Sequence, residues 1–568
     1  MKNFLTTVLL IFLAGPVATA NSGNLVGIAP YCEGNISWYN KASPVTPIKI
    51  EVKFTKPQKW YINTLNILTS DTELIWEKYK KKFSGFIHVY FRDDKKCIFP
   101  AKIRQSGDWK DHIILADGNI QQSLNVKLNK GNILGVVSFK LLIPSTREGK
   151  NEVIFTTLLR ELGYLAPRTR FVGVELMGNS YEAIFQENPR KELLESSNLR
   201  EGPLLEGNER FMWESEKNSI KDKLTFSRLT NSKWASRGAT SFQISNIAVS
   251  RLNSAFLDYL ILRHATVKHS KYNHVYLDNS KLSNNNKQHT QYLDSYDSIV
   301  TAADGTHALL PHNRKFYYDP IYQKFLPIYY DGDISFNAIS EAGGVPFGVS
   351  PSAVSGAAYA MQKLNSLNLD EFSMKVKEQG VLIKKEELKD IIQIIVTNLN
   401  YLQSYKIEDV EIIRNLKDYI RSVSNDFPNV RYAYFDDLKN SLFICPELLE
   451  SCEFRSLTTA DYAKLLAGKL KIDDWASVLY LGVVNIGSLD GYEQANLSSS
   501  TFKTSNLPGN VKLTTTLGMK VKYDSDANIL VIDQNVPDGR ALLSGGKING
   551  MNIIFSGVNS LNVNKNKQ

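Results

Sequence analysis

Hydrophobic and polar residues alternate along much of the first 190 residues, and this pattern predicts short β-strands. Two of these segments flank a turn at Asn179, so we expect them to form a hairpin. The predicted strands are residues 86–91, 124–128, 138–142, 171–176 and 183–187.

A helical spacing of apolar residues interrupts these strands and returns later in the chain. Apolar residues from Ile154 to Leu162 share one helical face, and Gly163 is the expected end of that helix. The same spacing predicts mainly helical structure over residues 190–265 and 357–424.

The regions between and after these helices differ from them in composition and in hydrophobic pattern. Residues 278–300 are polar and rich in asparagine, which predicts an exposed insertion. Strands are expected again at 315–318 and 325–330. Residues 495–509 have the composition of a linker, and alternating segments between 518 and 555 predict a small β module.

The overall composition is that of an ordinary folded protein. Of the 568 residues, 43% are hydrophobic and 22% charged, which excludes collagen-like, mucin-like and wholly disordered chains. The net charge of +9 is small for a chain of this length, so we expect no nucleic-acid partner.

The first 20 residues have the features of a secretory signal peptide. Lys2 precedes the apolar stretch Leu5–Ala14, and Ala18–Ala20 supplies the small residues of a cleavage site. The stretch is shorter than the roughly 20 apolar residues that span a bilayer. We therefore expect an exported protein (periplasmic, on the cell surface or secreted) without a transmembrane span in its mature chain. An uncleaved anchor is the alternative.

Export makes disulfides possible for the four cysteines. Cys32 with Cys97, and Cys445 with Cys452, is the pairing we favour among three connectivities. Unpaired buried thiols are the alternative.

The segment from His312 to Asp333 carries the most chemical information. Asn313 precedes one predicted strand, and the next strand is followed by Asp331-Gly-Asp333, so a hairpin would bring these side chains to the same end. Their oxygens suit Mg²⁺ or Mn²⁺. A phosphoryl-transfer site uses such an Asn and Asp to hold metal against nucleotide phosphates. A plain hairpin with an Asp-Gly turn is the alternative.

Several motifs, taken in their order along the chain, resemble the CotH-type kinases, a secreted or surface-associated branch of the protein-kinase-like fold. The downstream motif is His312-Asn313, followed by the hairpin and Asp331-Gly-Asp333. The upstream motifs are Ile103–Gly107, Ser123–Leu128, Leu162–Pro167, Phe171–Glu175 and Ala183–Glu187.

The resemblance covers roughly residues 85–340 and implies a two-lobed protein-kinase-like core. Together with the patterns outside that range, the expected fold is α+β, with an N-terminal extension and a C-terminal small β module. The expected units are a signal peptide (1–20), the extension (21–100), an N-lobe (101–190), a C-lobe with a helical extension (191–440), a helical and linker region (441–509) and the β module (510–558).

The resemblance also implies ATP and Mg²⁺ (or Mn²⁺) as cofactors and gives some residues roles. Lys127 would contact the nucleotide phosphates, with Lys140 as its rival, unless Lys127 is only a solvent-facing lysine of its strand. Glu152 would be the ion-pair partner of that lysine, unless it is only an acidic residue favoured by the helix dipole. Asn313, Asp331 and Asp333 would hold the metal.

Other implied contacts involve the early strands. Arg104 belongs to the family's Arg-and-Gly turn, and the turn Gly107–His112 could face the phosphates. Gln186 and Glu187 would lie at the join of the two lobes, where they could face an adenine. A strand-end carboxylate that forms a structural ion pair is the alternative.

The family pattern fails at the expected general base. A kinase-like catalytic loop has an Asp about five residues before the metal-binding Asn, and that position is Ala308 here. Asp304 or His307 could take the acceptor's proton instead. An earlier loop ending at Asn273 has the same defect, because Lys268 occupies the acidic position. A degenerate pseudokinase is therefore also possible.

Three functions are consistent with the sequence. The first is an exported CotH-like phosphotransferase that phosphorylates a protein or glycan hydroxyl with ATP and Mg²⁺. The second is a non-catalytic envelope, surface-assembly or glycan-binding protein that keeps a pseudokinase fold. The third, a polysaccharide-processing enzyme, lacks a convincing carboxylate pair, because Asp331 and Asp333 are only two residues apart.

Overall fold

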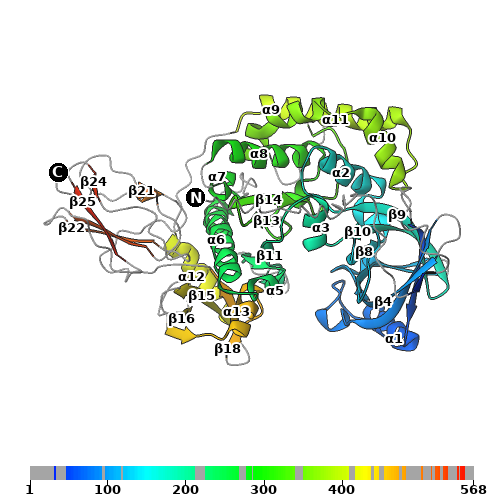
Figure 1. The fold of residues 1–568 in the computed structure, drawn as a ribbon, viewed down its shortest axis with the longest axis horizontal. Coiled ribbons are helices and arrows are strands. Elements are labelled where there is room, and N and C mark those ends of the chain that lie inside the picture. The colour runs from blue at the N-terminus through cyan, green and yellow to red at the C-terminus, as the bar shows by residue number, and fades with distance from the viewer. Residues whose placement is uncertain are drawn as a thin grey trace, which may run out of the picture.

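Figure 1 shows the computed structural model of the chain. The described residues are 31–32, 47–91, 96–116, 119–211, 224–267, 277–283, 286–339, 349–407, 416–436, 441–446, 453–472, 476–481, 501–502, 513–514, 519–524, 529–534, 546–548 and 551–556. The expected signal peptide and most of the expected linker lie outside them.

Seven strands close into a β-barrel, drawn in blue and cyan in Figure 1. The closing contact joins β4 to β7, where Ala101 lies opposite Leu128 and Gln105 opposite Leu124. All neighbouring strands are antiparallel except β2 and β9. Around the barrel the strands are β4 (Lys96–Gln105), β3 (Phe83–Phe91), β2 (Pro47–Phe54), β9 (Thr169–Leu176), β10 (Asn179–Glu187), β8 (Ser138–Leu142) and β7 (Leu124–Leu128).

Apolar side chains fill the barrel because every second residue of its strands points inward. Phe139 and Phe185 stack inside it, with ring centroids 4.4 Å apart. Trp60 of helix α1 (Pro57–Leu68) is buried in the same cluster, and its indole N–H donates to the Gln122 side chain at 2.9 Å. The smaller elements near the barrel are β1 (Tyr31–Cys32), η2 (Glu77–Tyr79), η4 (Lys110–His112), β5 (Ile113–Ala116), β6 (Asn119–Gln122) and η5 (Pro144–Arg147).

The expected fold class was wrong, because the core is not a two-lobed protein-kinase-like core. Strands from the expected extension (21–100) and the expected N-lobe (101–190) belong to one closed barrel. Alternation along a strand shows which face is buried, but it does not show which strands pair. The pairing of β4 with β7, which closes the ring, therefore had no signal in the sequence pattern.

A four-stranded antiparallel sheet, in the order β12-β11-β13-β14, follows the barrel in the chain. Two of its strands fall in the region 190–265, which was expected to be mainly helical. The elements of this part are α3 (Lys191–Ser196), β11 (Leu204–Gly207), β12 (Ser227–Leu229), α5 (Ser232–Ala235), α6 (Ala239–Val267), α7 (Asn279–Leu282), α8 (Lys287–Ala302), η6 (Thr306–Leu309), β13 (Lys315–Asp319) and β14 (Lys324–Ile328).

The prediction of an exposed insertion at 278–300 was wrong, because this stretch contains α7 and a largely buried α8. Its polar side chains are hydrogen-bonded inside the protein. Asp297 accepts from the Arg314 guanidinium at 2.7 Å, and Asp294 accepts from the Asn279 amide at 2.9 Å. Buried polar groups are tolerated when they are paired in this way, so a polar composition did not mean exposure here.

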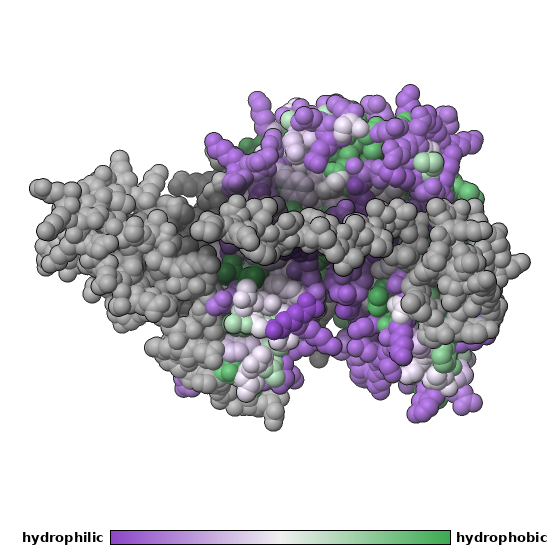
Figure 2. All heavy atoms as spheres, viewed as in Figure 1, coloured by the Kyte–Doolittle hydropathy of each residue, from purple (hydrophilic) through white to green (hydrophobic). Residues whose placement is uncertain are grey.

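Helices α9 (Pro351–Asn365), α10 (Leu369–Glu378) and α11 (Lys385–Ser404) pack above α8 and α2 (Lys150–Glu161) in Figure 1. Figure 2 shows that the surface over these helices is mainly hydrophilic. Among the described residues, no helix combines the length and apolar character needed to cross a membrane.

The remaining elements follow α11. They are α12 (Leu416–Asp426), β15 (Val430–Asp436), β16 (Ser441–Cys445), β17 (Glu453–Ser456), α13 (Thr459–Leu466), β18 (Lys471–Ile472), β19 (Ala476–Tyr480), β20 (Thr501–Phe502), β21 (Leu513–Thr514), β22 (Met519–Asp524), β23 (Ile529–Gln534), β24 (Gly546–Ile548) and β25 (Met551–Ser556). The last four form one sheet in the region of the expected β module.

The strand register bears on one of the expected disulfides. Cys32 of β1 lies directly opposite Cys97 of β4, and opposed residues of antiparallel strands have the Cα separation that a disulfide requires. Cys452 lies outside the described residues. Both pairings therefore remain predictions.

Candidate functional site

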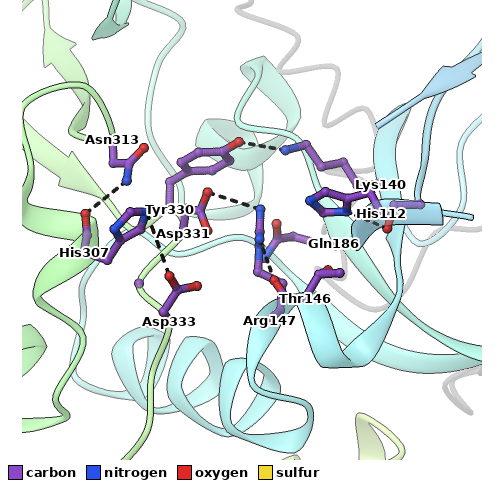
Figure 3. Close-up of polar contacts among 12 residues, drawn as sticks. His112, Lys140, Thr146, Arg147, Gln186, His307, Asn313, Tyr330, Asp331 and Asp333 are labelled. Carbon is purple, nitrogen blue, oxygen red and sulfur yellow. Dashed lines mark hydrogen bonds and ion pairs between the residues drawn. The ribbon is translucent and has the colours of Figure 1, made fainter. Parts of the chain in front are cut away.

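The β13–β14 hairpin brings the two ends of the segment His312–Asp333 close together. Lys315, the first residue of β13, lies opposite Ile328, the last residue of β14. Asn313 comes just before β13, and Asp331 follows soon after β14, so both lie at the open end of the hairpin. Figure 3 shows them in one polar cluster with His307 and Asp333.

Three side chains at this end form a candidate cation site. One ligand atom each of His307, Asp331 and Asp333 lies within 4.8 Å of the others. The His307 Nε2 atom is 3.9 Å from an Asp333 carboxylate oxygen, and the Asn313 amide donates to the backbone carbonyl of His307 at 3.1 Å. Carboxylate, imidazole and amide groups suit Mn²⁺, and the oxygen donors alone suit Mg²⁺.

The backbone that presents the two aspartates has an uncommon conformation. Asp331 and Asp333 have φ values of 54° and 51°, in the left-handed region that is rare for residues other than glycine. Such conformations cluster at functional sites. Gly332 between them leaves no room for a side chain, since an added Cβ would lie 2.6 Å from the Tyr329 hydroxyl oxygen.

Basic side chains from the barrel side face these aspartates (Figure 3). The Arg147 guanidinium donates to Asp331 at 3.2 Å and to the Thr146 carbonyl at 2.6 Å. Its Nε–H is buried without a partner in the described part of the chain. The Lys140 ammonium donates to the Tyr330 hydroxyl at 2.8 Å.

Tyr330 lies between two lysines. The Lys140 and Lys315 ammonium nitrogens are 4.7 Å and 4.0 Å from its ring centroid, distances typical of cation–π contacts. Lys315 also forms an ion pair with Glu206, which in turn pairs with Arg228. The ring therefore holds two positive charges close to the aspartates.

The two aspartates differ in proton affinity. Burial is the largest single influence on Asp331 and favours its neutral form, but the charges of Arg147, His307 and Lys140 together outweigh it and lower the pKa of this carboxyl. Burial, together with the charge of Asp331, raises the pKa of Asp333. Asp331 is thus held as an anion beside Arg147, while Asp333 is the carboxyl that gains a proton more readily.

Two basic side chains near the aspartates, Lys140 and His112, bind their protons less tightly than usual. Burial, followed by the charge of Arg147, lowers the pKa of Lys140 to about 8. The same two causes lower the pKa of the buried His112 to about 3, so its ring is neutral near pH 7.

Glu152 lies beside this cluster but does not pair with a lysine. One carboxylate oxygen accepts from the Gln186 amide at 2.6 Å, and the other accepts from the Tyr329 hydroxyl at 2.6 Å. The side chain is fully buried, and burial raises its pKa to about 7. The expected lysine partner is therefore replaced by two neutral donors.

The strand register of the barrel places Lys140 at the cluster and Lys127 away from it. Arg104, Asn125, Lys140 and Gln186 form one row across β4, β7, β8 and β10 on the outer face of the barrel. Lys140 reaches the cluster directly, and Arg104 lies two strands away from it. Lys127 is exposed on β7, opposite Lys102 and Ser138.

Other expected residues have different partners. Both carboxylate oxygens of Glu187 accept from Arg168, at 2.8 Å and 2.6 Å. Asp304 accepts from the Ser335 hydroxyl and the Asn337 amide and is not among the three candidate ligands. Asn273, the end of the alternative catalytic loop, lies outside the described residues.

Sequence reasoning missed Arg147 and the hydroxyl of Tyr329. Nothing in the short segment before α2 marks Arg147 as a partner of Asp331, because the two residues are 184 positions apart. Tyr329 belonged to a predicted strand, where an aromatic residue is ordinary.

No protein-family model matches the chain, and no curated protein matches it either.

Proposed function

We propose that this protein is a metal-dependent phosphotransferase that uses ATP with Mg²⁺ (or Mn²⁺) to phosphorylate a hydroxyl group of a protein or glycan. The supporting observation is the juxtaposition of the candidate ligands His307, Asp331 and Asp333 with the cations of Arg147 and Lys140. Phosphoryl transfer depends on positioning and on neutralising phosphate charge rather than on covalent chemistry. Membership of the CotH-type kinases is part of this proposal, without the two-lobed core.

The residues of the site would bind the cation and the phosphates. Asp331 and Asp333, with the amide oxygen of Asn313, would hold a divalent cation, which neutralises phosphate oxygens when bound. Arg147 keeps a buried N–H without a partner in the described residues, and such a donor suits a phosphate oxygen. Lys140 would supply a second positive charge.

The acceptor's proton requires a base near the transferred group. Of the two candidates, Asp304 already accepts from Ser335 and Asn337. His307 lies beside Asp333 at 3.9 Å. The proposal therefore gives the proton to His307, with the cation held by the two aspartates.

A non-catalytic surface-assembly or glycan-binding protein is the second candidate. The observation in its favour is Ala308, which is buried and occupies the position where a catalytic Asp was expected. On that hypothesis the site would bind nucleotide without turnover.

Radiolabelled ATP tests the first proposal. The purified protein with Mn²⁺ or Mg²⁺ should transfer the γ-phosphoryl group to itself or to an added protein or glycan, and Asp331→Asn should abolish the transfer. Asp111→Asn is the matched control, because Asp111 is exposed beside the cluster and is not a candidate ligand. Nucleotide binding without transfer would favour the second candidate, and absence of binding would refute the first.

A further inference from the structure

The first turn of α2 and the short segment before it contact the chain around Asp331 and Asp333 at three points. Arg147, three residues before α2, pairs with Asp331. The Asn151 amide donates to the Ile334 carbonyl at 3.0 Å. Glu152 reaches the segment through the Tyr329 hydroxyl. Two of these contacts act on the backbone around the aspartates rather than on a ligand atom.

The third contact is a relay of hydrogen bonds. Tyr329 has one hydroxyl proton, and it is donated to the Glu152 carboxylate at 2.6 Å. A lone pair on the same hydroxyl oxygen then accepts the backbone N–H of Gly332 at 3.2 Å. Gly332 is the residue between the two left-handed aspartates. The relay therefore fixes the peptide plane that joins them.

The relay also ties the aspartates to the barrel. The second oxygen of Glu152 accepts from Gln186 of β10 at 2.6 Å. Glu152 and Tyr329 are both fully buried. A fully hydrogen-bonded buried network of this kind holds its members in one arrangement. The absence of a Cβ on Gly332 is what lets the tyrosine hydroxyl approach its backbone.

We propose that Glu152 and Tyr329 are positioning residues, which fix the Asp331–Asp333 backbone so that both carboxylates face one cation. The inference rests on the proposed metal-dependent function. It assigns Glu152 a role through Tyr329, in place of the lysine partner expected from the sequence. Partners in the second shell of a metal site orient the ligands, and their loss weakens metal binding by about 10- to 100-fold.

Mn²⁺ titration followed by electron paramagnetic resonance tests this role. Tyr329→Phe removes only the hydroxyl and should weaken Mn²⁺ binding by about tenfold or more. Tyr164→Phe is the matched control, since it also removes a buried hydroxyl, bonded to Ser295 at 2.7 Å, in the same hydrophobic cluster. The control should bind Mn²⁺ like the wild type. Equal affinities of Tyr329→Phe and the wild type would overturn the proposal.

Substitutions of Glu152 separate the relay from the negative charge. Glu152→Met removes the acceptor and should match Tyr329→Phe. Glu152→Gln puts an amide at this position. Its oxygen can still accept from the Tyr329 hydroxyl, and its NH₂ group can donate to the side-chain oxygen of Gln186 once the Gln186 amide has rotated. This variant should therefore keep nearly wild-type Mn²⁺ affinity. An equal loss in both variants would show that the charge matters instead, and would overturn the relay.

Amide hydrogen exchange without metal keeps this inference distinct from the proposed function. Exchange over residues 331–334 should be faster in Tyr329→Phe and Glu152→Met than in the wild type or in Tyr164→Phe. If the wild-type protein fails to bind Mn²⁺ but shows this difference, the proposed function fails and the relay stands. Unchanged exchange in both variants would overturn the relay.

Discussion

The buried carboxyl of Glu152 should make the stability of this protein depend on pH in a way that one substitution removes. Glu152 is fully buried, and burial raises its pKa from 4.5 to about 7 despite the two hydrogen bonds that it accepts. The substitution Glu152→Gln keeps the size and the acceptor oxygen but cannot ionise. The two proteins should therefore differ only in the free energy of ionising this group.

The size of the effect follows from the shift in pKa. A difference of one pKa unit corresponds to about 1.4 kcal/mol, so this shift corresponds to roughly 3 kcal/mol. Because the folded state binds the proton more tightly, the contribution is fully present below the unfolded pKa. It is lost as pH rises through the folded value. The wild type should thus lose roughly 3 kcal/mol relative to Glu152→Gln between about pH 4 and about pH 8.

Urea unfolding followed by circular dichroism measures this difference. Taking the wild type minus Glu152→Gln at each pH cancels the titration of groups that both proteins share. The difference should fall steadily across the interval. A difference that stays constant, or one that grows with pH, would refute the argument that burial dominates the proton affinity of Glu152.

Three further substitutions test the site and the core. Lys140→Ala should weaken ATP binding measured by calorimetry. Lys127→Ala alters an exposed lysine on another strand and should leave ATP binding unchanged. The reverse result would contradict the proposed placement of the phosphates beside Lys140. Asp297→Ala should lower the free energy of unfolding by about 3–5 kcal/mol, because it leaves the buried guanidinium of Arg314 without its carboxylate. An effect below about 1 kcal/mol in urea titrations would argue against a buried ion pair between these two residues. Gly332→Ala should weaken Mn²⁺ binding, because its Cβ would lie 2.6 Å from a buried hydroxyl oxygen, and wild-type affinity would show that the loop adapts.

The hairpin and its polar residues were predictable because their signals are local. Strand alternation and the turn between the strands specify β13 and β14, and their register then brings Asn313 and Asp331 to one end. The helix from Lys150 to Glu161 also follows from apolar spacing and a terminal glycine. In each case residues close in sequence determine the structure.

The barrel and the partners of the site were not predictable from such patterns. Closure depends on the pairing of β4 with β7, and alternation carries no information about strand partners. Lys127 and Lys140 occupy similar positions in their strands, and only the register across the barrel shows that Lys140 faces Tyr330. Arg147 is joined to Asp331 across 184 residues, without any local signal.

Asp331 and Asp333 are proposed to bind one divalent cation beside His307. A Mn²⁺ titration of the wild-type protein, Asp331→Asn and Asp111→Asn tests this proposal most directly. The wild type and Asp111→Asn should each bind one Mn²⁺ per chain, and Asp331→Asn should bind it at least about tenfold more weakly. Equal Mn²⁺ affinity in all three proteins, or no Mn²⁺ binding by the wild type, would contradict it.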